Sequence, residues 1–299
     1  MSDAIAPAVS SAASVSPDTG IIDRIDALLQ QAWEIRNRDP HRGHALAAEA
    51  RALSVDHGYK LGRARANRVL CMTVVDEAGV QSIFSLAKEA KQLFDEVGDH
   101  EGRAGARDFL SSLHEHIGDL TTALNFALDA LAIAQKIDHP VRQGYALTSV
   151  GSVLAGSGDV DAGVERLHAA IRQFERVNDT DGIRSTHSRL LTVWKKAGRT
   201  DEALAHFERF VTEADTDDNE YLRFTALTLR AETEHQQGHF EAAIQLYQEA
   251  IACFSDEPGR SIIGSEAQIS LAKCMMDHGD LIGAEAELTD ALRRIEDNP

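Results

Sequence analysis

Histidine is the residue type in this chain that could most readily bind a metal ion or transfer a proton, and the sequence contains 13 histidines. The densest pair is His114 and His116, but residues two positions apart point to different sides of a helix. Neither an HExxH nor a CxxC motif occurs. We therefore expect no metal site and no cofactor. Five further histidines lie beside predicted helix breaks, where exposed turn residues are common: His57, His100, His139, His239 and His278.

Residues 151–158, GSVLAGSG, have the glycine content of a phosphate-binding loop. The segment lacks the Lys-Ser/Thr ending of such a loop, and it continues a helical pattern instead of following a strand. A helix face of small residues with its C-terminal cap explains it better. No other catalytic constellation occurs, so we expect a chain that is not an enzyme, although a catalytic output domain could be missing from it.

Glycines that recur at a fixed interval determine the expected architecture. Gaps of 39, 40, 40, 40 and 41 residues separate Gly79, Gly118, Gly158, Gly198, Gly238 and Gly279. A second set of helix breakers keeps an interval of 40, half a period away: Gly58, Gly98, Asp138, Asn178, Asp218 and Pro258. Two interleaved series predict a repeated helix–turn–helix unit, and a period of this size is typical of a solenoid.

The apolar pattern supports an all-α fold of about seven helix pairs, or about 14 helices, between Ile22 and Glu296. In residues 141–178, one apolar face precedes the Gly158-Asp159 break and a second follows it. We expect repeats at about 21–58, 59–98, 99–138, 139–178, 179–218, 219–258 and 259–297, forming one superhelical domain over 21–299. The Ala/Ser/Pro-rich residues 1–20 are expected to be a disordered tail.

These residues resemble the tetratricopeptide repeat (TPR). Leu147, Gly151 and Leu154 match the pattern of its helix A, and Ala243, Tyr247 and Ala250 match that of helix B. The period of 40 departs from the common length of about 34 and resembles the longer variant of bacterial regulatory proteins. The resemblance implies a right-handed α-solenoid. Residues 28–53 are also similar to the opening repeat of sensory regions upstream of bacterial signalling domains, notably GGDEF diguanylate cyclases, nucleotide cyclases and histidine kinases.

The resemblance implies that the A helices line a concave groove that binds a protein or peptide. Arg65, Arg68, Lys195 and Lys196 could clamp a carboxylate or an acidic peptide there. The alternative is a solvated face whose charges serve solubility. The full set of expected groove positions is Arg65, Arg68, Asp108, Ser112, Glu115, His116, Tyr145, Thr148, Ser152, Ser188, Thr192, Lys195, Lys196, Thr228, Glu232 and Lys273.

Charge and composition exclude several other partners. The net charge of −18 disfavours binding to nucleic acid and to anionic membranes, because both require a positive protein surface. The excess of acidic residues either keeps the protein soluble or lines an acidic groove for a basic partner. No run of 18 apolar residues could span a membrane, and the N-terminus lacks the basic region of a signal peptide. The three distant cysteines imply no disulfide framework and fit a reducing cytoplasm.

The last predicted helix, residues 281–296, is as apolar as an internal one, whereas solenoids usually end in a helix with a polar outer face. Either the chain is cut from a longer protein or this end forms a homodimer. The leading hypothesis is a regulatory or sensory module in which a bound partner changes superhelix pitch or dimer geometry and so biases an output domain. The alternatives are a stand-alone peptide receptor and a scaffold or adaptor.

Overall fold

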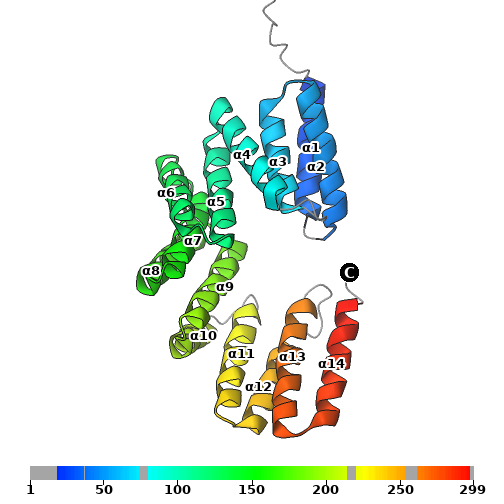
Figure 1. Cartoon of the computed structure of the whole chain (residues 1–299), viewed down its shortest axis with the longest axis vertical. Coiled ribbons are helices and arrows are strands. Elements are labelled where there is room, and N and C mark those ends of the chain that lie inside the picture. Colours follow the sequence, from blue (N-terminus) through cyan, green and yellow to red (C-terminus); the bar gives the residue numbers. More distant parts are fainter. Residues whose placement is uncertain (1–18, 37, 74–79, 214–219, 254–260, 297–299) are drawn as a thin grey trace, which may run out of the picture. The chain divides into compact units, whose positions relative to one another are not determined.

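The computed structural model describes residues 19–36, 38–73, 80–213, 220–253 and 261–296, and they form 14 helices without a strand (Figure 1). The all-α prediction is therefore confirmed. None of the described helices is both long and apolar enough to cross a membrane. The helices are α1 (Thr19–Ile35), α2 (Pro40–Asp56), α3 (Lys60–Met72), α4 (Val80–Val97), α5 (His100–His116), α6 (Leu120–Lys136), α7 (Pro140–Gly156), α8 (Val160–Glu175), α9 (Thr180–Lys196), α10 (Thr200–Glu213), α11 (Glu220–Gln236), α12 (Phe240–Ala252), α13 (Ser261–His278) and α14 (Leu281–Glu296).

The predicted breakers end the helices by adopting the left-handed backbone conformation. Gly158 has φ +100°, and Asp138 and Asn178 take over the same role in the second series with φ 46° and 54°. A residue with positive φ ends a helix while supplying the last backbone hydrogen bonds. After Gly158, the Asp159 side chain accepts a hydrogen bond from the Ala162 N–H at 3.2 Å and starts α8. Three predicted breakers, Gly79, Asp218 and Pro258, lie outside the described residues.

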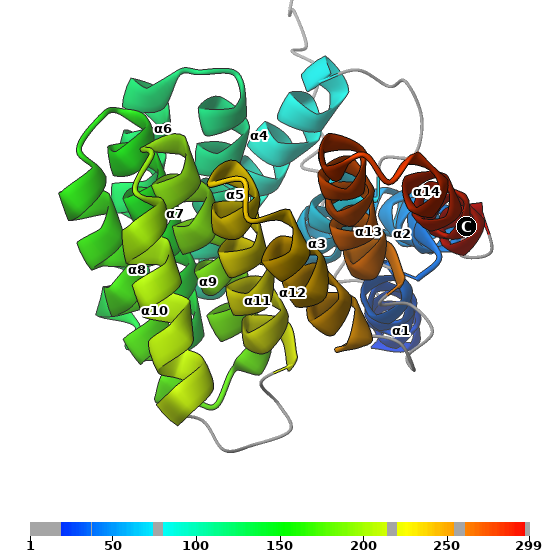
Figure 2. The ribbon, with the colours of Figure 1, turned by 90° about the horizontal axis from the view of Figure 1, so that it is seen from below.

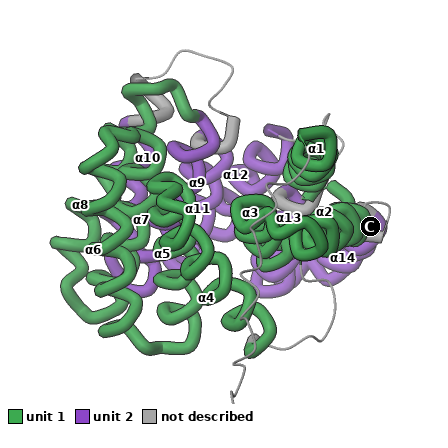
Figure 3. The backbone as a smooth tube through the Cα atoms, turned by 90° about the horizontal axis from the view of Figure 1, so that it is seen from above, with its two compact units in different colours: residues 1–179 green, residues 180–299 purple. Residues whose placement is uncertain are grey.

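The chain divides into two compact units, residues 1–179 with α1–α8 and residues 180–299 with α9–α14 (Figure 3). Each unit is a series of antiparallel helix pairs, in which an odd-numbered helix A packs on the following even-numbered helix B. The expected single superhelical domain over 21–299 stays a prediction. The expected tail over 1–20 falls almost wholly outside the described residues, since α1 begins at Thr19.

Successive repeats are joined through their A helices as well as through B-to-A packing. In unit 1, α1 contacts α3 and α5 contacts α7, and in unit 2 α11 contacts α13. Figure 2 shows α11, α12 and α13 side by side in unit 2. These contacts place the A helices of neighbouring repeats side by side at three points along the chain.

Small residues allow the two helices of a repeat to approach closely. The alanines that lie five positions after turn glycines, such as Ala123, Ala203 and Ala243, are fully buried. The central repeat uses glycine instead: a Cβ added at Gly163 would lie 2.7 Å from the carbonyl oxygen of Gly151 in α7. Backbones this close leave no room for a side chain. This close approach explains why the sequence of residues 151–158 predicts a helix face made of small residues.

Candidate binding site

All 16 expected groove residues lie on A helices: Arg65 and Arg68 on α3; Asp108, Ser112, Glu115 and His116 on α5; Tyr145, Thr148 and Ser152 on α7; Ser188, Thr192, Lys195 and Lys196 on α9; Thr228 and Glu232 on α11; and Lys273 on α13. Many share one register of the repeat. Arg68 and Asp108 are 40 residues apart, and Thr148, Ser188 and Thr228 continue the series. The structure therefore presents different chemistry at equivalent positions of successive repeats.

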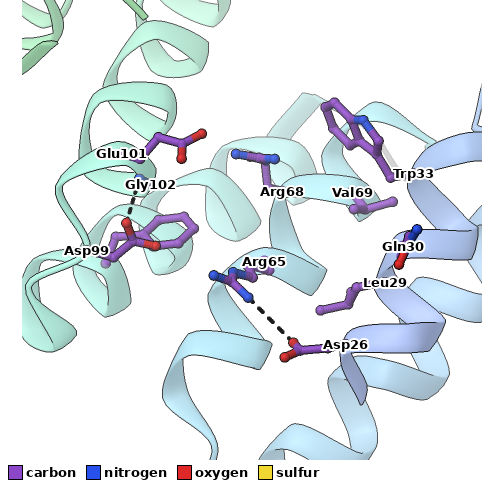
Figure 4. Close-up of a pocket in the computed structure, with 11 residues that line it drawn as sticks. Asp26, Leu29, Gln30, Trp33, Arg65, Arg68, Val69, Asp99, Glu101 and Gly102 are labelled. Carbon is purple, nitrogen blue, oxygen red and sulfur yellow. Dashed lines mark hydrogen bonds and ion pairs between the residues drawn. The ribbon is translucent and has the colours of Figure 1, made fainter. Parts of the chain in front are cut away.

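Arg65 and Arg68 line a cavity of about 370 Å³ within unit 1 (Figure 4). One wall belongs to α1 and one to α3, and the third is formed by Phe94 of α4 with the start of α5 and its N-cap residue Asp99. The residues that line the cavity are Asp26, Leu29, Gln30, Trp33, Arg65, Arg68, Val69, Phe94, Asp99, Glu101 and Gly102. The cavity is thus a mixed site with two aromatic side chains, aliphatic side chains, two arginines and three carboxylates.

Arg68 is the unusual member of this cavity. Its guanidinium makes neither an ion pair nor a hydrogen bond with any residue that the structure describes, and its Nε is buried without a hydrogen-bond partner. Its Cζ lies 4.9 Å from the centroid of the Trp33 ring, a cation–π contact. Buried charges are normally paired; Arg68 makes no direct pair with a described residue, but the carboxylates of Asp99 and Glu101 lie in the same cavity lining and attract its charge.

The other cations around the cavity form direct ion pairs. Arg65 reaches the carboxylate of Asp26 at 3.5 Å, and Arg142 of α7 donates to Glu101 at 2.7 Å. Burial, followed by repulsion from Arg142 and Arg65, lowers the pKa of Arg68 to about 10, although attraction to Glu101 and Asp99 opposes this shift. The hydrogen bond from Arg142 lowers the pKa of Glu101, so this carboxylate stays ionised in its pair with Arg142. Asp99 and Glu101 attract the guanidinium of Arg68 across the cavity, so the three carboxylates and two arginines of the lining leave no excess positive charge there.

A second cavity, of about 450 Å³, lies within unit 2 and contains two more of the expected groove residues, Glu232 and Lys273. Lys195 of α9 forms an ion pair with Glu232 at 2.8 Å. Burial raises the pKa of the Tyr247 phenol in this cavity, so its hydroxyl stays protonated. The cavity is lined by Glu232, His235, Gln236, Tyr247, Ser270, Lys273 and Asp277, and His235 contacts Asp277 at 2.8 Å. Its charges are largely paired.

Several expected groove positions serve the scaffold. Asp108 accepts a hydrogen bond from Ser149 of α7 at 2.6 Å and so links two A helices. Ser152 is only 3% exposed, so its placement on the groove surface was wrong: close packing of α7 takes this position into the interior. The hydroxyls of Thr148 and Thr192 donate to carbonyls one turn back in their own helices.

Sequence reasoning missed Trp33, Asp26, Glu101 and Arg142 as members of the site. The sequence did contain a signal for the three charged residues, namely the spacing between each of them and its oppositely charged partner. Arg142 lies 41 residues after Glu101, and Arg65 lies 39 after Asp26, both close to the period of 40. Complementary residues about one period apart meet on neighbouring A helices. The stacking of Arg68 on Trp33 has no such signal.

The histidines form no metal site in the part of the chain that the structure describes, since no group of three or more His, Cys, Asp or Glu there could hold an ion. His114 instead contacts Asp119 at 3.1 Å and packs between the rings of Phe84 and Phe126. His187 and His206 contact each other at 3.0 Å in the interior of the α9–α10 pair. These histidines are parts of the packing.

Comparisons with known proteins show the fold. No protein-family model and no curated protein match the chain. Among solved structures, it is similar to a signal transduction ATPase (STAND) with a tetratricopeptide repeat sensor from Pyrococcus horikoshii, with TM-score 0.60 and 16% identity; the match covers 92% of this chain and 42% of that one. The apo form of RapI matches with TM-score 0.57 and 16% identity over 91% of this chain and 99% of its own. Aspartyl phosphate phosphatase F from Bacillus subtilis matches with TM-score 0.56 and 11% identity over 92% and 71%. The fold is thus a TPR-like helical solenoid, and this chain spans less than half of the ATPase.

Proposed function

We propose that this chain is a non-enzymatic regulatory module that binds a protein or peptide on the A-helix face of unit 1. The observation that carries the proposal is the cavity between α1, α3 and α5, in which the guanidinium of Arg68 makes no direct ion pair with any residue that the structure describes. A cavity that offers aromatic, aliphatic, cationic and anionic side chains together suits a polypeptide segment, which can present both apolar and polar groups.

Photo-crosslinking in the cell that expresses the protein tests this proposal. A photoreactive phenylalanine replaces Ser112, which is exposed on α5, or Asp129, which is exposed on helix B of the same repeat. The proposal expects one discrete polypeptide to be captured at position 112 and none at position 129. Capture at 129 with none at 112 would place binding on the opposite face and contradict it.

We further propose that the module acts within a bacterial signalling system in the cytoplasm and controls an attached or associated output domain, such as a diguanylate cyclase. Two facts support this: residues 28–53 resemble the opening repeat of such sensory regions, and the similar ATPase carries its repeats as a sensor in a longer chain. The gene sequence after codon 299 and the neighbouring genes test it. If neither the sequence after codon 299 nor the neighbouring genes encode a signalling output domain, this assignment is contradicted, while the binding proposal stays intact.

A stand-alone peptide receptor is the second candidate. It is favoured by the likeness to RapI, which this chain matches over 99% of its length, and to the apo form of the quorum sensor NprR from B. thuringiensis, with TM-score 0.54 and 11% identity. Small-angle scattering discriminates the candidates. A receptor that encloses its peptide becomes more compact on binding, whereas a scaffold or adaptor with no ligand of its own keeps its dimensions.

We also propose that α14 forms a homodimer contact. Leu281, Ile282, Leu288 and Leu292 are 65%, 84%, 41% and 57% exposed on one helix, more apolar surface than a solvent-facing helix normally carries. Light scattering over a concentration series measures the mass. We expect a dimer that the double change Leu288→Glu and Leu292→Glu converts to a monomer; a protein that is already monomeric at high concentration would refute the contact.

A further inference from the structure

The apolar surface near the C-terminal end of unit 2 is not confined to α14. Ile269 and Met276 of the preceding helix, α13, are 49% and 51% exposed, beside the exposed Leu288 and Leu292 of α14. The two helices pack on each other as helix A and helix B of one repeat (Figure 1). The preceding repeats show which side of this repeat the four side chains occupy.

Leu288 lies at a position that the following A helix covers in an interior repeat. It follows the turn glycine of its repeat by nine residues, as Tyr247 and Phe207 do in theirs. Tyr247 and Phe207 are at most 1% exposed, and Tyr247 packs with Leu271 and Cys274 of the following A helix. Leu288 is therefore on the side of α14 at which an interior repeat meets the next one.

Met276 lies at a position through which two earlier A helices reach the next A helix. Lys195, His235 and Met276 each precede the turn glycine of their repeat by three residues. Lys195 of α9 forms an ion pair with Glu232 of α11 at 2.8 Å, and His235 of α11 contacts Asp277 of α13 at 2.8 Å. At the equivalent position, α13 carries an apolar side chain.

Ile269 shows the same exchange seven residues earlier, on the same face of α13. Its position, ten residues before the turn glycine, is occupied by Asp108 in α5 and by Thr228 in α11. Asp108 accepts a hydrogen bond from Ser149 of the next A helix at 2.6 Å. Both positions that make polar pairs with a following repeat elsewhere are thus apolar and exposed in α13, on the same side of the repeat as Leu288.

This exchange favours a second copy of the chain as the partner of the surface. Near the axis of a two-fold symmetric dimer, a residue faces its own counterpart. Two lysines would repel each other there, whereas Ile269 and Met276 are compatible with themselves. Packing of this surface on the first helix of another copy has no apolar counterpart, because the exposed side chains of α1 are polar or small, among them Asp23, Gln31 and Glu34.

We propose that Ile269 and Met276 of α13 join Leu288 and Leu292 of α14 in a two-fold symmetric contact with a second copy of this chain. The proposal rests on the homodimer contact proposed above for α14, and it adds a second helix and a symmetry to that contact. Two helices from each copy come closer than one to the roughly 800 Å² for each partner that a stable interface buries.

Light scattering over a concentration series tests the part played by α13. The double change Ile269→Thr with Met276→Lys installs residues that α11 and α9 carry at the same positions, so the helix should still form. We expect it to raise the dissociation constant of the dimer at least about a hundredfold. Met72→Lys is the matched control: this methionine of α3 is 47% exposed, and its replacement should leave the dimer unchanged. Far-UV circular dichroism shows that each variant is folded.

Cross-linking tests the symmetry. Met276→Cys is combined with Cys253→Ser, which leaves the buried Cys71 and Cys274 as the other thiols. A short bismaleimide should join two chains through position 276. Gln31→Cys on α1, in the same Cys253→Ser background, should remain a single chain under the same conditions.

Three results would overturn the inference: an unchanged dimer in the variant with Ile269→Thr and Met276→Lys, no cross-link through position 276, or equal cross-linking through position 31. If the double change Leu288→Glu and Leu292→Glu still separates the copies in these cases, the α14 contact stands without α13. A chain that is monomeric at high concentration refutes both contacts, and capture of a partner at position 112 is independent of either.

Discussion

Replacing Arg68 with methionine should stabilise the folded protein, although it removes a charged side chain from the cavity of the proposed binding site. The pKa of Arg68 is lowered to about 10, which means that folding disfavours its charged form by at most ~3 kcal/mol, at about 1.4 kcal/mol for each pKa unit. This penalty applies throughout the pH range below about 10, because Arg68 is charged there in both the folded and unfolded states. Methionine keeps the apolar contact but loses the cation–π contact with Trp33, which contributes roughly 0.5–1 kcal/mol.

Because Arg68 is only half-buried, solvent screens part of the penalty, and we expect a net gain of about 1 kcal/mol at pH 7. Urea unfolding followed by far-UV circular dichroism measures it. Arg65→Met is the control: Arg65 pairs with Asp26 on the surface, where such a pair contributes less than about 1 kcal/mol, so this variant should not gain stability. If Arg68→Met instead lowered the free energy of unfolding by ~1 kcal/mol or more, Arg68 would be a satisfied structural residue and the argument from its missing ion pair would fail.

Three further predictions concern the scaffold. Gly163→Ala should destabilise the protein by about 1–3 kcal/mol in chemical unfolding, because the added Cβ would lie 2.7 Å from a carbonyl oxygen of α7. Gly264→Ala is the control: a Cβ there meets nothing within 4 Å, so this change should be neutral or stabilising. Burial opposes ionisation of Asp95, but hydrogen bonds from neighbouring basic side chains outweigh it and lower the pKa of its carboxyl below 3.8. The ionised carboxylate therefore stabilises the folded protein at neutral pH, and this stabilisation is lost as pH falls below about 4. Asp95→Asn should reduce the loss of stability in acid, measured by unfolding curves over a pH series. Burial raises the pKa of the Cys71 thiol to about 12, so mass spectrometry after alkylation at pH 8 should find it unmodified while the half-exposed Cys253 reacts.

The repeat architecture could be predicted because its signal is local and repeated many times. Each turn needs a residue that tolerates positive φ, and Gly158 or Asn178 reveals that need in the sequence itself. The small residues that face each other across a repeat, such as Gly151 and Gly163, follow from the same register. Polar pairs between A helices, such as Glu101 with Arg142, obey the period and could have been found by searching for complementary residues about 40 apart.

The cavity itself could not be predicted, because it depends on side-chain directions that periodicity does not specify. Arg68 was expected on the groove, but its stacking on Trp33 and its lack of a direct ion pair with a described residue arise from three helices meeting at particular angles. Ser152 shows the converse: its register matches that of Ser112, yet closer packing around α7 buries it. Equivalent positions of a repeat thus share a location on the helix but not an environment.

Hydrogen exchange with the partner captured by photo-crosslinking tests the central claim most directly. The partner is added to the unmodified chain, and exchange is compared between the A helices α3 and α5 and the B helices α2 and α6. Binding on the A-helix face predicts that amides in α3 and α5 exchange at least roughly tenfold more slowly, with little change in α2 and α6. Slowing confined to the B helices, or a partner that binds without slowing α3 and α5, would contradict the account.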